Sequence, residues 1–280
     1  MGNNVTVDEH ARDAVSLGRL LIIGGGEDRC CGSGVLERFV ELCGGSLARI
    51  TLVTTATGVP DEVHAEYEQV FRKLGVPCTR ELRLRGRGDA DGDAAAAILR
   101  DSTGVFISGG DQSRIRALVG SRTNDILRER LASGLVVAGT SAGATAMGRT
   151  MILGGEGPDV SAAAVRTGPG LDLLPNVLID MHFAARGRLP RLLSAVALDR
   201  DYLGVGIDEN TAILVEGDHF EVLGTGVATV ADAERATVVH PAGDCDPITL
   251  FDVRLHLMPA GCIFDIGQRK PSIGPAHSRY

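Results

Sequence analysis

The chain has 280 residues, of which 44% are hydrophobic and 37 are glycine, and it carries a formal net charge of −8. This length suits one large domain or two modest ones, and the composition is typical of soluble α/β proteins. The acidic balance argues against nucleic-acid binding, and no apolar run approaches the roughly 18 residues of a membrane span. The six cysteines form no C-x-x-C pair, so we expect reduced thiols and a cytoplasmic location.

The first half of the chain alternates the patterns of strands and helices. Apolar runs predict strands at about 19–23, 47–55, 77–84, 104–108 and 135–138. Amphipathic patterns predict helices at about 33–43, 60–74, 93–99, 112–119 and 123–133. This alternation indicates a doubly wound, mostly parallel sheet, in which ligands bind beyond the carboxyl ends of the strands. Three such ends carry polar or glycine-rich turns: Gly24–Glu27, Gly109–Gln112 and Ser141.

The second half has a different character. A strand over 176–183 is followed by an arginine-rich helix over 185–198, and short strands with tight turns begin at 202. We expect these antiparallel strands to extend one side of the same sheet. No linker or repeat divides the chain, so we expect a single domain over 18–268, a flexible arm over 1–17 and a tail over 269–280.

The glycines that follow the first strand raise the question of a phosphate site. The dinucleotide pattern G-x-G-x-x-G fails because Arg29 occupies its last position, and no ribose-binding acid is evident. An ordinary loop is therefore the favoured interpretation.

Residues 139–143, Gly-Thr-Ser-Ala-Gly, form a G-x-S-x-G pattern between an apolar strand and small helix-compatible residues. In a nucleophile elbow both glycines are needed, because a Cβ at either position would clash in the tight turn. The geometry would expose the hydroxyl of Ser141 above the carboxyl edge of the sheet. An ordinary strand–glycine–helix turn is the alternative, so the choice depends on a base and an orienting acid elsewhere.

His182 is the best candidate base, because it closes an apolar strand and opens an arginine-rich segment. The other histidines fall in expected tails, in an exposed helix or among the C-terminal strands; they are His10, His64, His219, His240, His256 and His277. Glu209, in the polar Asp-Glu-Asn cluster at 208–210, is the best candidate acid, although a plain turn would have the same composition. Serine, imidazole and carboxylate in one row would form a catalytic triad.

Backbone amides would then supply the oxyanion hole. The N–H of Ala142 is one expected donor, and the N–H of Gly109 or Gly110 is the second, since a glycine permits close approach. Three arginines follow the candidate base, at positions 186, 188 and 191. Two of them could share a helix face and bind carboxylates, or all three could belong to a solvated face.

These residues resemble the signature blocks of the cyanophycinase family, serine peptidases related to α-aspartyl dipeptidases. The blocks cover about residues 19–265 in order: Ile23–Asp28, Phe106–Gln112, Gly139–Gly143, Asp180–Arg188 and Gly206–Ala212. The resemblance implies a flavodoxin-like, class I glutamine-amidotransferase-like fold with an antiparallel C-terminal extension. It also implies a Ser141–His182–Glu209 triad that works without metal or cofactor.

The resemblance further implies the substrate. Cyanophycin is a poly-aspartate backbone with arginine amide-linked to each side chain, and family members act as exopeptidases that release β-Asp-Arg dipeptides. Substrate-binding roles would fall to five residues: Gln112, Asp180, Arg186, Arg188 and Arg191. The arginines would hold carboxylates, and Asp180 would take a guanidinium. Family members are commonly homodimers, so we expect one here.

One position departs from the family pattern, because Met181 stands where glutamine usually precedes the base histidine. Replacing a hydrogen-bonding side chain would alter discrimination between substrates. The sequence therefore leaves open a related hydrolase or acyltransferase that acts on another aspartyl or isoaspartyl peptide. A non-catalytic binding homologue is a third possibility, against which the complete triad argues.

Overall fold

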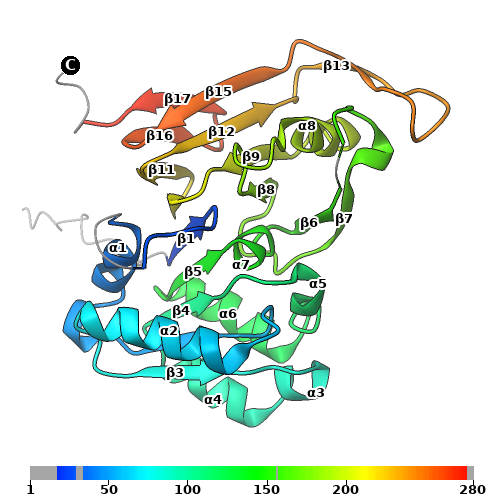
Figure 1. Cartoon of the computed structure of the whole chain (residues 1–280). Coiled ribbons are helices and arrows are strands. Elements are labelled where there is room, and N and C mark those ends of the chain that lie inside the picture. The colour runs from blue at the N-terminus through cyan, green and yellow to red at the C-terminus, as the bar shows by residue number, and fades with distance from the viewer. Residues whose placement is uncertain (1–17, 30–33, 156, 276–280) are drawn as a thin grey trace, which may run out of the picture.

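Five parallel strands form one half of a nine-stranded sheet, in the order β1-β5-β4-β2-β3 (Figure 1). The computed structural model describes residues 18–29, 34–155 and 157–275. The parallel strands are β1 (Arg19–Ile23), β2 (Ile50–Val53), β3 (Thr79–Leu82), β4 (Gly104–Ile107) and β5 (Val136–Thr140). The four inner strands are continuous apolar runs because helices or strands cover both of their faces.

Helices lie on both faces of this parallel half, as the alternating pattern predicts. One face packs against α1 (Val35–Leu42) and α2 (Pro60–Lys73), whose aromatic residues Phe39, Tyr67 and Phe71 contact one another and Phe106. The opposite face packs against three helices: α4 (Asp93–Asp101), α6 (Arg122–Ala132) and α7 (Ala142–Thr145). Single turns form α3 (Arg87–Ala90) and α5 (Gln112–Ile115), and short 3-10 helices span Gly45–Leu47 and Ala162–Ala164. None of the described helices is both long and apolar enough to cross a membrane.

Four antiparallel strands continue the sheet beyond β1. They are β10 (Thr211–Glu216), β11 (His219–Gly224), β16 (Cys262–Asp265) and β17 (Lys270–Ile273). A tight hairpin turn joins β10 to β11, and Gly217 adopts a positive φ there. Strand β17 lies inside the segment that we expected to be a tail.

The expectation that every C-terminal strand joins this sheet was wrong. A separate four-stranded sheet has the order β15-β12-β9-β8 (Figure 1). Its strands are β8 (Val177–Met181), β9 (Leu203–Ile207), β12 (Val227–Asp232) and β15 (Arg254–Pro259). Strands β8 and β9 are buried on both faces: one faces the main core, and the other packs against α8 (Leu189–Leu198) through Leu192 and Val196. Two-stranded pairs are formed by β6 (Thr150–Gly154) with β7 (Arg166–Pro169), and by β13 (Thr237–Val239) with β14 (Thr249–Phe251).

Candidate active site

Ser141 lies in a sharp turn between β5 and α7, with a positive φ of 51°. A Cβ at Gly139 would lie 2.6 Å from the carbonyl oxygen of Gly143, and one at Gly143 would lie 2.3 Å from that of Ile107. Both contacts are far shorter than side chains tolerate, so the two glycines are sterically required. The turn is fixed further by the N–H of Ser141, which donates to the carbonyl of Ile23 on β1. This arrangement has the geometry of a strained nucleophile elbow at a sheet edge.

His182 and Glu209 complete one row with Ser141. The hydroxyl oxygen of Ser141 lies 2.9 Å from Nε2 of His182, and Nδ1 of His182 lies 2.6 Å from Oε1 of Glu209. The imidazole is largely buried, whereas the Glu209 side chain is half exposed. If Nδ1 donates to the carboxylate, Nε2 is free to accept the serine proton. The row therefore has the connectivity that general-base activation of a hydroxyl needs.

Hydrogen bonds to the carbonyl of Gly24 and to the side chain of Asp208 hold this row in place. His182 follows β8 with a φ of 48°, and its N–H donates to the carbonyl of Gly24 at 2.7 Å. Asp208 accepts from the N–H of Ala184 and of Val227, which fixes the loop carrying Glu209 against the loop carrying His182. The polar cluster at 208–210 therefore has one member in the row and at least one that supports the surrounding backbone.

The glycine loop after β1 forms the floor beneath His182 and Glu209. A Cβ at Gly25 would lie 2.3 Å from Cε1 of the imidazole, and one at Gly26 would lie 3.2 Å from the Glu209 side chain. The sequence placed this loop at the same sheet edge as Ser141 and within the first signature block, and assigned no role to its glycines. The structure shows that they permit close approach of His182 and Glu209.

Glu27, at the end of this loop, is a buried carboxylate that sequence analysis did not assign. One oxygen accepts from the hydroxyl of Thr140, directly before Ser141, at 2.6 Å; the other accepts from Tyr67 and Arg29. Burial, together with the neighbouring Glu27 charge, raises the pKa of Tyr67 well above its usual value. The Tyr67 phenol therefore stays protonated and donates to Glu27, which joins the loop to α2, while the bond from Thr140 joins the loop to the elbow.

The expected oxyanion-hole residues lie beside Ser141. A Cβ at Gly109 would lie 3.3 Å from the Cβ of Ser141, and Gly110 adopts a φ of 142°, which favours glycine. Among the described residues, the backbone N–H groups of Gly109, Gly110 and Ala142 have no recorded acceptor. The site therefore has free amide donors close to the serine, as stabilisation of an oxyanion requires.

The residues expected to bind substrate are placed differently from one another. Asp180 is fully buried and both of its oxygens accept from Arg191, which is itself buried. Arg188 donates to the carbonyl and, at 2.7 Å, to the sulfur of Met181. Asp180 thus already holds a guanidinium of this chain, in place of the substrate guanidinium that the resemblance implied.

Arg186 and Gln112 remain nearer to open space. Arg186 is exposed in a turn, because α8 begins only at Leu189, with Pro190 in its first turn. The predicted helix over 185–198 therefore began four residues too early, and the three arginines do not share one helix face. Gln112 is half buried on α5 and donates to the carbonyl of Leu153 at 2.7 Å.

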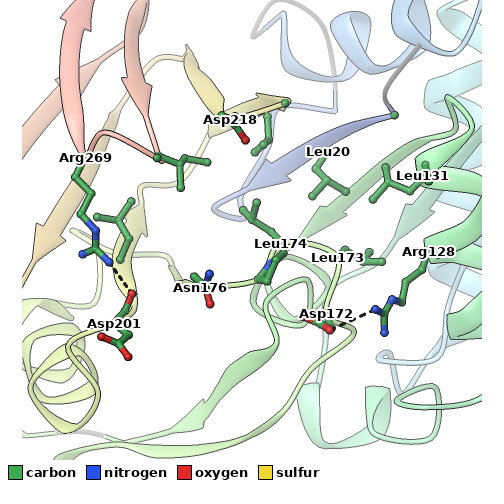
Figure 2. Close-up of a pocket in the computed structure, with 18 of the residues that line it drawn as sticks. Leu20, Arg128, Leu131, Asp172, Leu173, Leu174, Asn176, Asp201, Asp218 and Arg269 are labelled. Carbon is green, nitrogen blue, oxygen red and sulfur yellow. Dashed lines mark hydrogen bonds and ion pairs between the residues drawn. The ribbon is translucent and has the colours of Figure 1, made fainter. Parts of the chain in front are cut away.

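The largest hollow among the best-formed pockets lies elsewhere, at the amino ends of the parallel strands. Figure 2 shows this cavity of about 680 Å³, with Leu20, Leu131 and Leu174 on its apolar wall. Arg128 and Asp172 form an ion pair at its rim. No residue of the Ser141 row lines it. The size of a cavity therefore does not indicate where the expected catalytic residues of this protein lie.

Comparison with known proteins shows similarity to peptidases over most of the chain. The model of peptidase family S51 matches residues 20–223. A cyanophycinase from Trichormus variabilis is 37% identical over 256 residues, covering 89% of this chain and 86% of the relative. A cyanophycinase from Geminocystis herdmanii is 33% identical over 261 residues, covering 91% and 96%.

A crystal structure of a peptidase from an acI-B1 actinobacterium superposes with a TM-score of 0.61 at 22% identity, over 76% of this chain and 90% of that chain. At this identity the likeness concerns the fold alone. The family match and the curated relatives reach further, because they span most of the chain. The chain belongs to peptidase family S51, the family of the cyanophycinases, and is a serine-type peptidase.

Proposed function

We propose that this protein is a cyanophycinase, an exopeptidase that hydrolyses the poly-aspartate backbone of cyanophycin to β-Asp-Arg dipeptides. The observation that carries the proposal is the row of Ser141, His182 and Glu209, with distances of 2.9 and 2.6 Å between successive partners. Cyanophycinases from two cyanobacteria match most of the chain at 33–37% identity.

In the proposed mechanism, Nε2 of His182 takes the proton of Ser141 as the hydroxyl oxygen attacks the scissile carbonyl carbon. The N–H groups of Ala142 and of Gly109 or Gly110 donate to the oxyanion of the tetrahedral intermediate. His182 then gives its proton to the leaving amine, and the acyl-enzyme forms. A water molecule, deprotonated by His182, attacks this ester and releases the product, and Ser141 recovers its proton.

Substrate carboxylates would be bound by the arginines that follow His182, at positions 186, 188 and 191. Arg186 is exposed, with no recorded partner among the described residues, and is the freest of the three arginines. Arg188 and Arg191 would contribute charge while they hold Met181 and Asp180 in place. Gln112 would contribute an amide beside the loop over 109–111, which carries expected oxyanion donors and is called the oxyanion loop below.

The experiment that tests this function is incubation of the purified protein with insoluble cyanophycin, with mass spectrometry of the soluble products. We expect β-Asp-Arg from the native protein and none from Ser141→Ala. Native protein that is folded and releases no dipeptide would contradict the proposed substrate.

A second candidate is hydrolysis or acyl transfer on another aspartyl or isoaspartyl peptide, and Met181 favours it. The side chain of Met181 is buried against Arg188, where a thioether offers only a weak acceptor. Under this alternative, Met181→Gln would increase turnover of cyanophycin severalfold. Under the first candidate, the native protein already hydrolyses the polymer, and the substitution has little effect.

We also propose a homodimer and a cytoplasmic location. Leu255, Leu257 and Ile273 are large apolar side chains exposed on neighbouring edge strands, and they form a surface that a second copy could cover. The described cysteines Cys43, Cys78, Cys245 and Cys262 are free thiols, as in a reducing compartment; Cys30 and Cys31 lie outside the described residues. Light scattering of the native protein and of Leu257→Glu tests the dimer.

A further inference from the structure

A second hollow, of about 440 Å³, lies at the carboxyl ends of β2 and β3. These strands run parallel to β5, so the hollow opens at the same edge of the sheet as Ser141. The oxyanion loop separates the two places. The N–H of Asp111 donates to the carbonyl of Ala56 at 2.9 Å, and a Cβ at Gly110 would lie 2.3 Å from the same oxygen. A ligand that crosses this single loop from Ser141 would reach the hollow.

The hollow is lined by three arginines and by no carboxylate among the described residues. Arg83 is neutralised by Asp61 and Glu81. Arg85 and Arg114 are exposed, and neither guanidinium has a recorded ion pair in the described part of the chain, although Asp61 and Asp111 lie close enough to interact electrostatically with them. Arg114 donates to the carbonyl of Thr57 at 2.9 Å, which holds its guanidinium at the rim. Two positive charges therefore remain available to an anion.

Two further groups support this interpretation. The nearest acid on the same segment, Asp111, accepts from the N–H of Ser113 at 2.8 Å, and its carboxylate caps α5. The hydroxyl of Thr55, which lines the hollow, is buried and has no hydrogen-bond partner. The Thr55 hydroxyl oxygen is closed off from solvent and does not compete for a ligand, so the polar groups that can bind an anion in the hollow are the guanidinium groups of Arg85 and Arg114.

The spacing of the strands gives the approximate distance between the hollow and Ser141. Neighbouring strands lie about 4.8 Å apart, and two to three such steps separate β5 from the space between β2 and β3, or about 12 Å. An extended peptide advances about 3.3 Å per residue. The group bound in the hollow would thus belong to a unit about three or four residues from the scissile bond.

We propose that Arg85 and Arg114 form a carboxylate subsite that binds a distant unit of an extended aspartyl polymer. This inference rests on the proposed function, because it assigns the part of the substrate that does not react. It implies that the enzyme prefers long polymers whose side chains end in carboxylates over short peptides.

Binding to the Ser141→Ala protein tests the subsite without cleavage. One fluorescent probe is an oligomer of six β-Asp-Arg units, and the other is the same oligomer with every arginine carboxylate converted to a primary amide. In fluorescence anisotropy, we expect Arg85→Gln or Arg114→Gln to weaken binding of the carboxylate oligomer about fivefold each, and the double variant to weaken it about twentyfold. The amide oligomer should change less than about twofold. Arg116→Gln, an exposed arginine on the same segment that does not line the hollow, is the matched control and should affect neither probe.

Equal affinity of the double variant and its parent for the carboxylate oligomer would overturn the subsite. Equal weakening of both probes would also overturn it, because the arginines would then act by supporting the loop. The proposed function fails separately, if the native protein releases no dipeptide from cyanophycin while the difference between the two probes persists.

Discussion

The two edges of the parallel sheet differ in how their polar groups are paired. At the amino edge, polar groups at the rim of the 680 Å³ cavity are paired within the protein: Arg128 with Asp172, and Arg269 with the carbonyl of Asp201 (Figure 2). At the carboxyl edge, the hydroxyl of Ser141 contacts His182, whereas the N–H groups of Gly110 and Ala142 have no recorded acceptor among the described residues. Unsatisfied hydrogen-bond donors around the strained turn at Ser141, rather than the volume of a cavity, therefore indicate the expected catalytic site.

The largest effect is expected from Ser141→Ala at the carboxyl edge. Removing the nucleophile leaves the amides and the arginines in place, so substrate binding persists while turnover falls by at least about 10⁴-fold. Rates of dipeptide release, measured with affinity for the same oligomer, separate the two effects. Residual turnover within tenfold of the native rate would show that the reaction uses another group.

The glycine floor provides the second prediction. Gly25→Ala places a Cβ 2.3 Å from Cε1 of His182, at a φ of 98°. Displacement of the base by about 1 Å should lower kcat about 100-fold. Gly75→Ala is the control, because its φ of 89° is similar and nothing lies within 4 Å of the added methyl group. Similar losses of kcat in the two variants would mean that backbone strain, and not contact with the imidazole, is responsible.

A third prediction concerns the stability of the elbow. Glu27→Gln removes a buried charge that accepts from Thr140, Tyr67 and Arg29, so the free energy of unfolding should fall by about 2 kcal/mol. Glu66→Gln also removes a partner of Arg29, but a half-exposed one, and should cost less than about 1 kcal/mol. Urea unfolding of both variants measures the difference, and equal losses would argue that the buried network is not what stabilises the loop.

The smallest effect is expected at the amino edge. Arg128→Gln breaks an exposed ion pair with Asp172, in which the charged atoms are 3.6 Å apart. Exposed pairs contribute less than about 1 kcal/mol, and this one lies far from Ser141. We expect thermal unfolding and dipeptide release to stay close to native values. A large loss of activity would mean that the two edges are coupled.

The elbow and its partners were accessible from sequence because local patterns carry them. Glycines at 139 and 143 indicate the turn, and His182 and Glu209 each follow a buried strand at a polar boundary. The second sheet was not accessible, since burial patterns show that β9 and β12 are strands but not which strands they pair with. The late start of α8 could have been found from Gly187 and Pro190.

Glu27 shows the limit of local reasoning. Its partners Tyr67 and Thr140 lie 40 and 113 positions away, so no pattern of spacing near Glu27 indicates its role. From the sequence, a carboxylate in a glycine-rich loop is expected to be exposed. The fold instead buries Glu27 against the phenol of Tyr67 and the hydroxyl of Thr140. The flavodoxin-like subclass and the catalytic roles of the site residues stay predictions.

The central claim is that Ser141 is a nucleophile activated by His182. Labelling with a fluorophosphonate, followed by peptide mapping, tests it without assuming any substrate. We expect a single adduct on Ser141 in the native protein, and labelling that is slower by orders of magnitude in a folded His182→Ala variant. No adduct on Ser141, or equally fast labelling of the two proteins, would contradict it.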